Sequence, residues 1–327
     1  MTMRIMKKII MILLVSSSWL TTSAQFEKII QPSDLKQQTI INEPVTLRKG
    51  FLRTGIEISY TAKDKYFNDE AGREYRPASI WGVFYNYDVG LQYGLSDRIE
   101  IDLYLPLVNN RNEGTTQKIQ PVLNTDDSEP TSQKSRGLGD CNLVILYQII
   151  PEKEKRFSMT LVADLSVPTG KKDISEIKNA YNYNLPTGEG NFRAGSGLYA
   201  RKILYPYSFS GGVAYYYNFS ATKLINPEDP GQTKFKSGNM ILASGSFNLH
   251  LNEWIALANE IHFMHQSEGR EEYMVIRTVK PRWDIGYMPR LVFQIRRFRV
   301  SQFVMIPILG RNMDADPKYS MSVQYTF

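Results

Sequence analysis

Between residues 81 and 107 apolar and polar residues alternate on both sides of a tight turn, and this pattern constrains the fold more than any other feature. The apolar parity carries Trp81, Val83, Tyr85, Tyr87, Val89, Leu91 and Tyr93, then Ile99, Ile101, Leu103, Leu105 and Leu107. Successive side chains of a β-strand point to opposite faces, so the stretch predicts two strands with one apolar and one polar face. Tyrosine and tryptophan dominate the first apolar face, which is typical of barrel strands whose outer side meets lipid.

The same alternation recurs along the chain. We expect strands over residues 55–61, 81–93, 98–107, 137–149, 157–167, 192–203, 207–219, 241–251, 255–263, 280–293, 298–308 and 319–327. The connections after every second strand are tight and most others are long, which is the pattern of bacterial outer-membrane barrels. The predicted fold class is therefore all-β, a transmembrane antiparallel up-and-down β-barrel of about 12 strands that spans residues 51–327. A β-sandwich with long loops is the alternative.

The first 24 residues have the three parts of a secretory signal peptide. Arg4, Lys7 and Lys8 precede an apolar run over residues 9–20, and small residues at 22–24 form a cleavage site. A short membrane anchor is the alternative, although the apolar run is short and polar residues follow it. Residues 25–50 show no sustained periodicity and are interpreted as a periplasmic N-terminal segment, or as a segment tucked into the barrel mouth.

Beyond the signal no run approaches the roughly 18 apolar residues of a membrane-spanning helix. Only helices and closed barrels satisfy backbone hydrogen bonds in lipid, so a barrel predicts the outer membrane of a Gram-negative bacterium with both termini periplasmic. The expected partners are outer-membrane lipid, lipopolysaccharide and a small-molecule solute. The last strand ends at Phe327 and resembles the signal that the barrel-assembly machinery reads.

Charge and cysteine content argue against several other functions. The formal net charge of +6 falls to +3 without the three cations of the signal, which makes no case for nucleic-acid binding. The single cysteine, Cys141, cannot form an intramolecular disulfide, and its apolar parity predicts a buried or lipid-facing side chain. Glu260 and His262 lack the spacing of a metal site, so neither a metal nor a cofactor is expected.

The parity opposite the apolar face carries the charged residues and predicts the lining of a lumen. These residues are Glu57, Asp88, Arg98, Glu100, Asp102, Asp140, Asp164, Arg193, Arg201, Glu260, His262, Arg282, Asp284, Arg290 and Arg299. An arginine on the lipid face near the midplane would cost roughly 2–4 kcal/mol, so this segregation follows from physics whatever the function. The functional hypothesis is a path for small, aromatic or amphipathic solutes. In the alternative, acidic residues of the first five strands pair with later arginines and block the passage.

The order of several short motifs resembles the phenol-degradation meta-pathway family of outer-membrane proteins. The motifs are GLSDRIE (94–100), LYLP (103–106), GLGD (137–140), LY (146–147), VPTG (167–170) and DPKYS (316–320) followed by the end of the chain. The resemblance covers roughly residues 81–327 and implies an outer-membrane β-barrel channel that helps small, often aromatic, compounds to cross. It implies no catalytic residues.

One segment points to an enzyme instead. His265-Gln266-Ser267-Glu268-Gly269 resembles the His-x-Ser-Asn-Gly segment of outer-membrane phospholipase A, in which His is the base for a Ser nucleophile. This alternative is a lipid esterase that uses Ser267 and His265. Glu268 stands in the Asn position, and no Asn follows before Gln294 to orient the base. A barrel with a structural or surface-interaction role is the third hypothesis.

Overall fold

The computed structural model describes residues 45–67, 75–115, 130–151, 157–173, 175–176, 183–224, 233–252, 254–272 and 276–327. The predicted signal peptide and residues 25–44 of the segment expected over 25–50 lie outside these residues. Within the described part of the chain, no helix is long and apolar enough to span a membrane.

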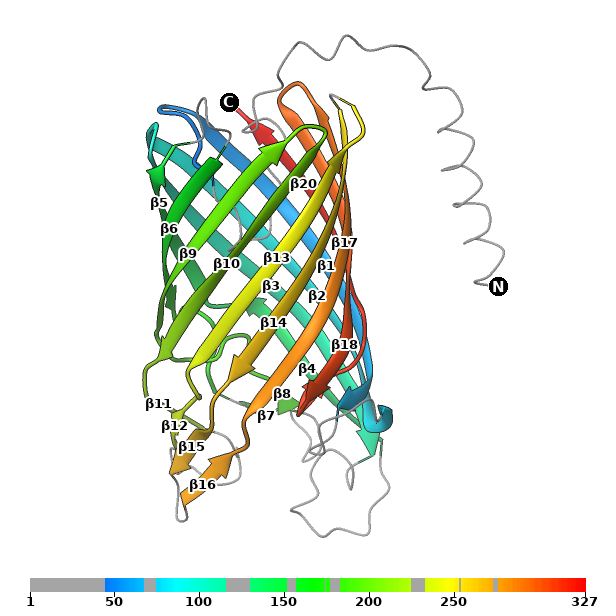
Figure 1. The fold of residues 1–327 in the computed structure, drawn as a ribbon. Coiled ribbons are helices and arrows are strands. Elements are labelled where there is room, and N and C mark those ends of the chain that lie inside the picture. Colours follow the sequence, from blue (N-terminus) through cyan, green and yellow to red (C-terminus); the bar gives the residue numbers. More distant parts are fainter. Residues whose placement is uncertain are drawn as a thin grey trace, which may run out of the picture. The chain divides into compact units, whose positions relative to one another are not determined.

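The strands of the main sheet follow one another around a closed barrel (Figure 1). They are β1 (Leu52–Phe67), β2 (Tyr75–Ser96), β3 (Ile99–Thr115), β4 (Pro130–Leu138), β5 (Cys141–Ile150), β6 (Phe157–Val167), β9 (Arg193–Leu204), β10 (Tyr207–Asn218), β13 (Met240–His250), β14 (Ile255–Gln266), β17 (Arg282–Ile295), β18 (Phe298–Arg311) and β20 (Lys318–Thr326). The barrel closes because β1 pairs antiparallel with both β2 and β20. Since β4 and β5 pair in succession with β3, they form one interrupted strand, and the described residues make a 12-stranded barrel. The predicted fold class is confirmed.

Several strands are longer than the sequence pattern predicted. The polar stretches at 62–78 and 109–135 were expected to be loops, yet β1 and β2 pair up to Phe67–Tyr75, and β3 and β4 pair up to Thr115–Pro130. Polar residues on both faces are compatible with a strand that has water on both sides, because the backbone ladder still satisfies its hydrogen bonds. The alternation of apolar residues therefore marks only the part of each strand with an apolar outer face.

The two ends of the barrel differ (Figure 1). Short turns join β2 to β3, β9 to β10, β13 to β14 and β17 to β18, and the C-terminus lies at this turn end. At the opposite loop end β11 (Ala221–Lys223), β12 (Thr233–Lys236), β15 (Gly269–Glu272) and β16 (Ile276–Val279) form a four-stranded sheet, and β7 (Ser175–Glu176), β8 (Tyr183–Asn184) and β19 (Met313–Asp314) extend the main one. In the small sheet Lys223 Nζ lies 3.7 Å from the centroid of the Phe235 ring.

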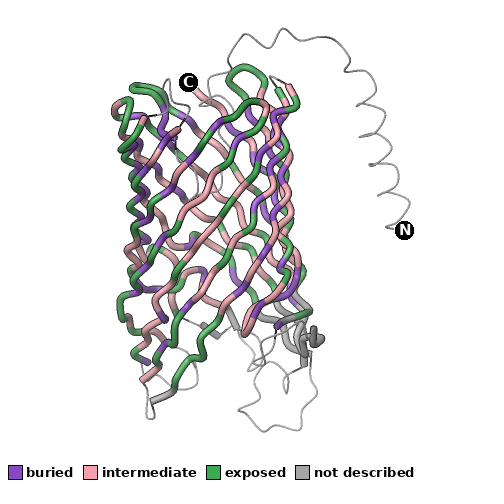
Figure 2. The backbone as a smooth tube through the Cα atoms, viewed as in Figure 1, coloured by how far each residue is buried: buried purple, intermediate pink, exposed green. Residues whose placement is uncertain are grey.

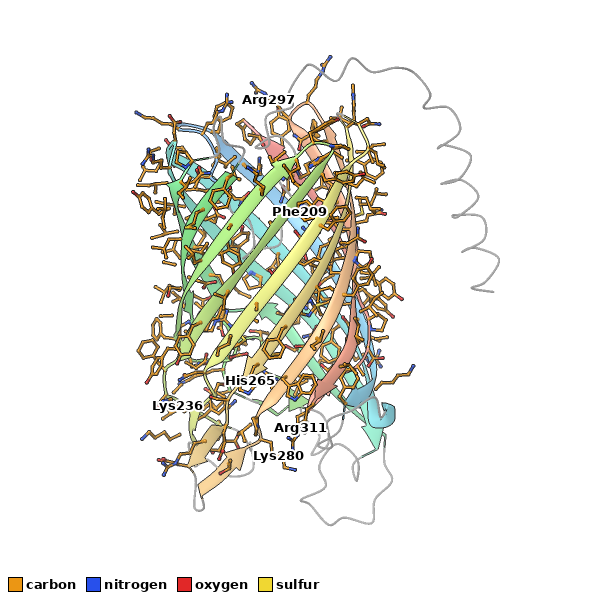
Figure 3. All side chains as sticks on the ribbon, viewed as in Figure 1. Phe209, Lys236, His265, Lys280, Arg297 and Arg311 are labelled. Atoms are coloured by element: carbon orange, nitrogen blue, oxygen red, sulfur yellow. The ribbon has the colours of Figure 1, made fainter. Side chains whose placement is uncertain are left out.

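Exposure alternates along the strands, as the banding in Figure 2 shows. Outward apolar side chains such as Val213 and Ile261 are 52% and 58% exposed, while their inward neighbours Ala214 and Glu260 are buried. Large basic side chains gather at the two rims, with Lys236 and Arg311 at the loop end and Arg297 at the turn end (Figure 3). An apolar outer belt between polar rims and a polar interior is the reverse of a soluble protein.

Asn259 is a polar residue on the apolar parity of β14. The hydroxyl of Tyr287, on the neighbouring strand β17, donates a 2.6 Å hydrogen bond to Asn259 Oδ1. This partner reduces the cost of placing an amide on the outer face, because an unpaired polar group in an apolar environment is expensive.

Candidate functional site

The interior of the barrel holds most of the charged residues predicted to face it. Buried in the structure are Glu100, Asp102, Asp164, Arg201, Glu260, Asp284, Arg290 and Arg299, and partly buried are Glu57, Asp88, Asp140, Arg193 and His262. Arg98 and Arg282, which stand at strand ends, are exposed. Arg282 Nε donates to Gln266 Oε1 at 2.5 Å.

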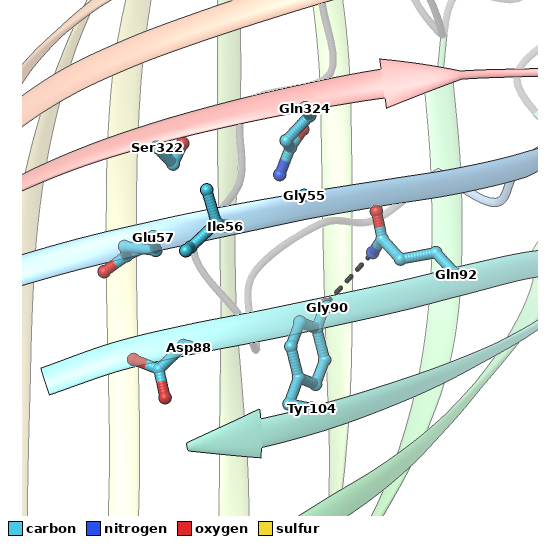
Figure 4. Close-up of a pocket in the computed structure, with 9 residues that line it drawn as sticks. All are labelled: Gly55, Ile56, Glu57, Asp88, Gly90, Gln92, Tyr104, Ser322 and Gln324. Carbon is cyan, nitrogen blue, oxygen red and sulfur yellow. Dashed lines mark hydrogen bonds between the residues drawn. The ribbon is translucent and has the colours of Figure 1, made fainter. Parts of the chain in front are cut away.

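Acidic side chains gather on the wall formed by β1, β2 and β3. Glu57 and Asp88 are direct cross-strand partners and line one small pocket with Tyr104 (Figure 4). Gln92 Nε2 donates to the Tyr104 hydroxyl at 3.0 Å and to Asp102 Oδ2 at 2.8 Å. The network orients Asp102 and Tyr104, and this wall of the interior is rich in carboxyl groups.

Arginines also face the interior, and one of them, Arg53, is on the same strand as Glu57. Arg53 Nε donates to Thr326 Oγ1 at 3.0 Å, and Arg299 Nε donates to Gln294 Oε1 at the same distance. The guanidinium of Arg290 lies 4.8 Å from the centroid of the Phe303 ring. Arg299 on β18 and Arg290 on β17 lie two and three strands from β1 around the barrel, so the charged groups of the interior set up a local field there.

A band of buried apolar side chains also lies inside the barrel, which the sequence analysis missed. The band consists of Tyr104, Val144, Leu146, Val162, Tyr199, Ala214 and Tyr216, all on the inward parity. Each of its tyrosines lies directly across from a glycine, and these pairs are Tyr104 with Gly90, Tyr199 with Gly212 and Tyr216 with Gly195. A Cβ on Gly195 would lie 2.3 Å from Cδ1 of Tyr216, so the glycine gives the ring space against the wall. The interior therefore offers both apolar and charged surfaces.

The described end of the N-terminal segment, residues 45–50, packs against the turn end of the barrel. The side chains of Val45 and Leu47 are buried, and the Leu47 N–H donates to a carboxylate oxygen of Glu100. Thr46 Oγ1 donates to Gln148 Oε1 at 3.1 Å. Gly50 N–H donates to the carbonyl of Gly94 at 2.7 Å. The segment thus contacts buried residues of β3 and β5 as well as the end of β2.

Two of the motifs behind the family resemblance meet where strand β4 gives way to β5. Thr169 Oγ1 donates to the Gly139 carbonyl at 2.8 Å. The Asp140 carboxylate accepts backbone N–H groups from Gly170, Glu189 and Gly190 at 3.0, 2.6 and 3.3 Å. The strand expected over 137–149 is interrupted here because this carboxylate secures the incoming loop. The Asp140 carboxylate therefore holds this loop against the barrel wall and does not point into an open path without partners.

Next to this junction lies a cavity of about 280 Å³. Its lining comprises Pro106, Val108, Gly139, Asp140, Asn142, Ser166, Pro186, Thr187, Gly188, Glu189, Asn191 and Arg193. The loop that bounds it is tied to β4, because Leu185 N–H donates to the Lys134 carbonyl at 2.6 Å and Ser135 Oγ donates to the Pro186 carbonyl at 2.8 Å. Hydrogen bonds to β4 thus hold the loop side of the cavity in place.

The proposed esterase pair is not assembled. Ser267 Oγ accepts the Asn239 N–H at 2.9 Å, and no hydrogen bond joins it to His265 among the described residues. On the neighbouring strands Ile241 and Trp283 are the register partners of His265. The described residues also contain no group of three potential metal ligands. The geometry gives the esterase hypothesis no support.

Comparison with known proteins agrees with the barrel. Residues 78–274 match the model of a family described as "Putative MetA-pathway of phenol degradation". The COG4313 outer membrane channel from Pseudomonas putida F1 has a similar structure, with a TM-score of 0.67 and 11% identity over 89% of this chain and 100% of that one. More distant likenesses are the translocator domain of autotransporter NalP from Neisseria meningitidis (TM-score 0.45, 8% identity, 90% and 92% covered) and the NanC porin (TM-score 0.44, 10% identity, 83% and 98% covered). At 11% identity the likeness to the COG4313 channel shows the fold.

Proposed function

The chain belongs to the family described as the MetA-pathway of phenol degradation, and on that premise we propose that it is an outer-membrane channel for the passive passage of small amphipathic or aromatic molecules. The observation that carries this proposal is the inverted distribution of side chains around a closed barrel. Val213 and Ile261 are exposed on the outside, whereas Glu100 and Asp102 are buried inside. Such an arrangement suits a wall with lipid outside and a polar path within.

The orientation that we propose places the turn end and the C-terminus in the periplasm and the loop end outside the cell. Short periplasmic turns and longer external loops are general in such barrels. The expected partners are outer-membrane lipid and lipopolysaccharide around the belt, and the assembly machinery at the strand that ends with Phe327. We also propose that residues 1–24 are a signal peptide and that residues 25–50 are a periplasmic segment.

We expect the purified mature chain, reconstituted in liposomes, to admit small uncharged and amphipathic solutes faster than empty liposomes do. The interior combines polar and apolar surfaces, so both kinds of solute find a favourable wall. The measurement is liposome swelling, with the folded state verified by the shift in gel mobility on heating. A correctly folded barrel that passes none of the solutes would favour the structural or surface-interaction alternative.

Residues 45–50 are expected to narrow the path at the turn end, because they pack onto buried residues of the barrel. Replacing Glu100 by alanine removes the acceptor of the Leu47 N–H, and an unsatisfied buried donor costs about 1–3 kcal/mol. The segment should then leave its site more often, and the mean single-channel conductance should rise about twofold or more. Glu100→Gln keeps an acceptor oxygen and should remain close to the wild type. Equal conductance in Glu100→Ala and wild type would contradict the expectation.

A further inference from the structure

Arg193 differs from the other arginines inside the barrel. Arg53 and Arg299 each donate a hydrogen bond to a neighbouring side chain, whereas Arg193 has neither a hydrogen bond nor an ion pair with any described residue. Its Nε is buried, and its guanidinium lies 5.3 Å from the centroid of the Tyr216 ring. A ring at this distance supports a cation and holds its plane, but it satisfies none of the N–H donors. The N–H groups of this guanidinium are therefore positioned to donate to an acceptor that the described chain does not supply.

The surroundings of Arg193 combine polar and apolar surfaces. Arg193 lines the cavity of about 280 Å³ together with Asn142, Ser166 and Asn191. The Oδ1 atoms of Asn142 and Asn191 are buried and have no hydrogen-bond partner, so they are free to accept a donor. Tyr216, over which the guanidinium lies, is part of the apolar band inside the barrel. The lining also contains Pro106, Val108 and Pro186, so a molecule in the cavity would meet a cation, two acceptors and apolar side chains.

The acidic residues near the cavity do not neutralise Arg193 by contact. The Asp140 carboxylate is occupied by three backbone N–H groups of the adjoining loop. Asp164 attracts Arg193 electrostatically, but the two groups form no ion pair, and Asp164 Oδ1 has no hydrogen-bond partner. Asp164 therefore disfavours a bound anion electrostatically, but its carboxylate does not occupy the position beside Arg193 that an anion would take.

We propose that this cavity is a subsite for the carboxylate of a small amphipathic organic acid, with Arg193 as the anion-binding group. A guanidinium binds a carboxylate through two parallel hydrogen bonds, and such charge-assisted bonds are stronger than neutral ones. The apolar part of the acid packs on Pro106, Val108 and Pro186 of the cavity lining, and Asn142 or Asn191 accepts from a hydroxyl on the same molecule. The cavity volume lies just below the usual range for ligand pockets, which suits a solute with a single ring. This inference rests on the proposed channel function.

The test compares benzoate with benzamide, its neutral counterpart of nearly the same shape, in planar bilayers and liposomes that contain the full mature chain. In the wild type we expect benzoate to be favoured and to reduce the ion current at millimolar concentration. Arg193→Gln should lower the benzoate to benzamide permeability ratio about tenfold, the size expected for one lost charge-assisted contact, with benzamide flux unchanged. Arg193→Lys keeps the charge without the planar guanidinium, so its benzoate to benzamide permeability ratio should lie between those of the wild type and Arg193→Gln.

Asp164→Asn is the opposite test, because it removes the competing negative charge from the same region. It should raise the benzoate to benzamide ratio above that of the wild type and strengthen the reduction of current by benzoate. The subsite is overturned if Arg193→Gln lowers both fluxes equally or leaves the ratio unchanged while the variant still folds. Failure of the channel function is a different result, namely that the folded wild type passes neither compound.

Discussion

Replacing Gly245 by arginine is expected to lower the free energy of unfolding from a bilayer by roughly 2–4 kcal/mol. Gly245 stands at the middle of β13 on the outward parity, between Gly211 of β10 and Ile261 of β14. A Cβ added there meets open space, so the substitution introduces a charge without a steric clash. An arginine near the midplane of the lipid face costs roughly 2–4 kcal/mol, a large fraction of the stability of most proteins.

The matched control for this variant is Gly245→Leu, which adds bulk of an apolar kind at the same place. It should fold as well as the wild type, because a leucine on the outer belt meets lipid. The measurement is the folded fraction in lipid vesicles, read from heat-dependent gel mobility and from the free energy of unfolding in denaturant. Equal folding of the arginine and leucine variants would mean that this face does not lie in a membrane.

The second large effect is expected at Gly195, where Tyr216 lies against the wall. The three atoms nearest to an added Cβ all belong to the ring of Tyr216, at 2.3–2.9 Å. Gly195→Val should therefore force the buried ring out of its place and lower the free energy of unfolding by about 1–3 kcal/mol, the usual cost of overpacking. The same substitution at Gly245, where space is open, should have little effect.

A double variant distinguishes this clash from a general effect of the lost glycine. Tyr216→Ala alone removes a buried ring and should cost about 3–5 kcal/mol. Adding Gly195→Val to it should cost little more, because the ring that the valine would strike is gone. Denaturant unfolding in vesicles gives the three values, and their coupling measures the contact. Strictly additive losses would contradict the assignment of the clash to Tyr216.

The local pattern of the sequence predicted the barrel correctly because each of its signals is short in range. Alternation with period two assigns every residue of a strand to one of two faces, so Val213 could be placed outside and Ser208 inside without knowing any neighbour. The same parity separated the charged residues from the apolar ones. Turn lengths added the even strand count and the difference between the two ends.

Contacts between distant parts of the chain were beyond the reach of that pattern. The apolar band was missed because it depends on Gly195 and Gly212 standing opposite tyrosines, which is decided by strand register. The hydrogen bonds from the backbone of residues 189–190 to the Asp140 carboxylate join positions about fifty residues apart. The position of residues 45–50 against Glu100 is of the same kind.

Sequence alone therefore determined which side of the wall each strand residue faces, since the geometry of one extended chain settles that question locally. Only the tertiary structure decided what each inward side chain meets. The isolation of Arg193 beside Tyr216 follows from the pairing of β9 with β10 and from the loop that closes the cavity, not from the residues next to it in the chain. The physical reason is that the side of the wall to which a residue points is set by the geometry of its own strand. The burial of its side chain, its contact partners and the space around it depend on other strands that are remote in sequence.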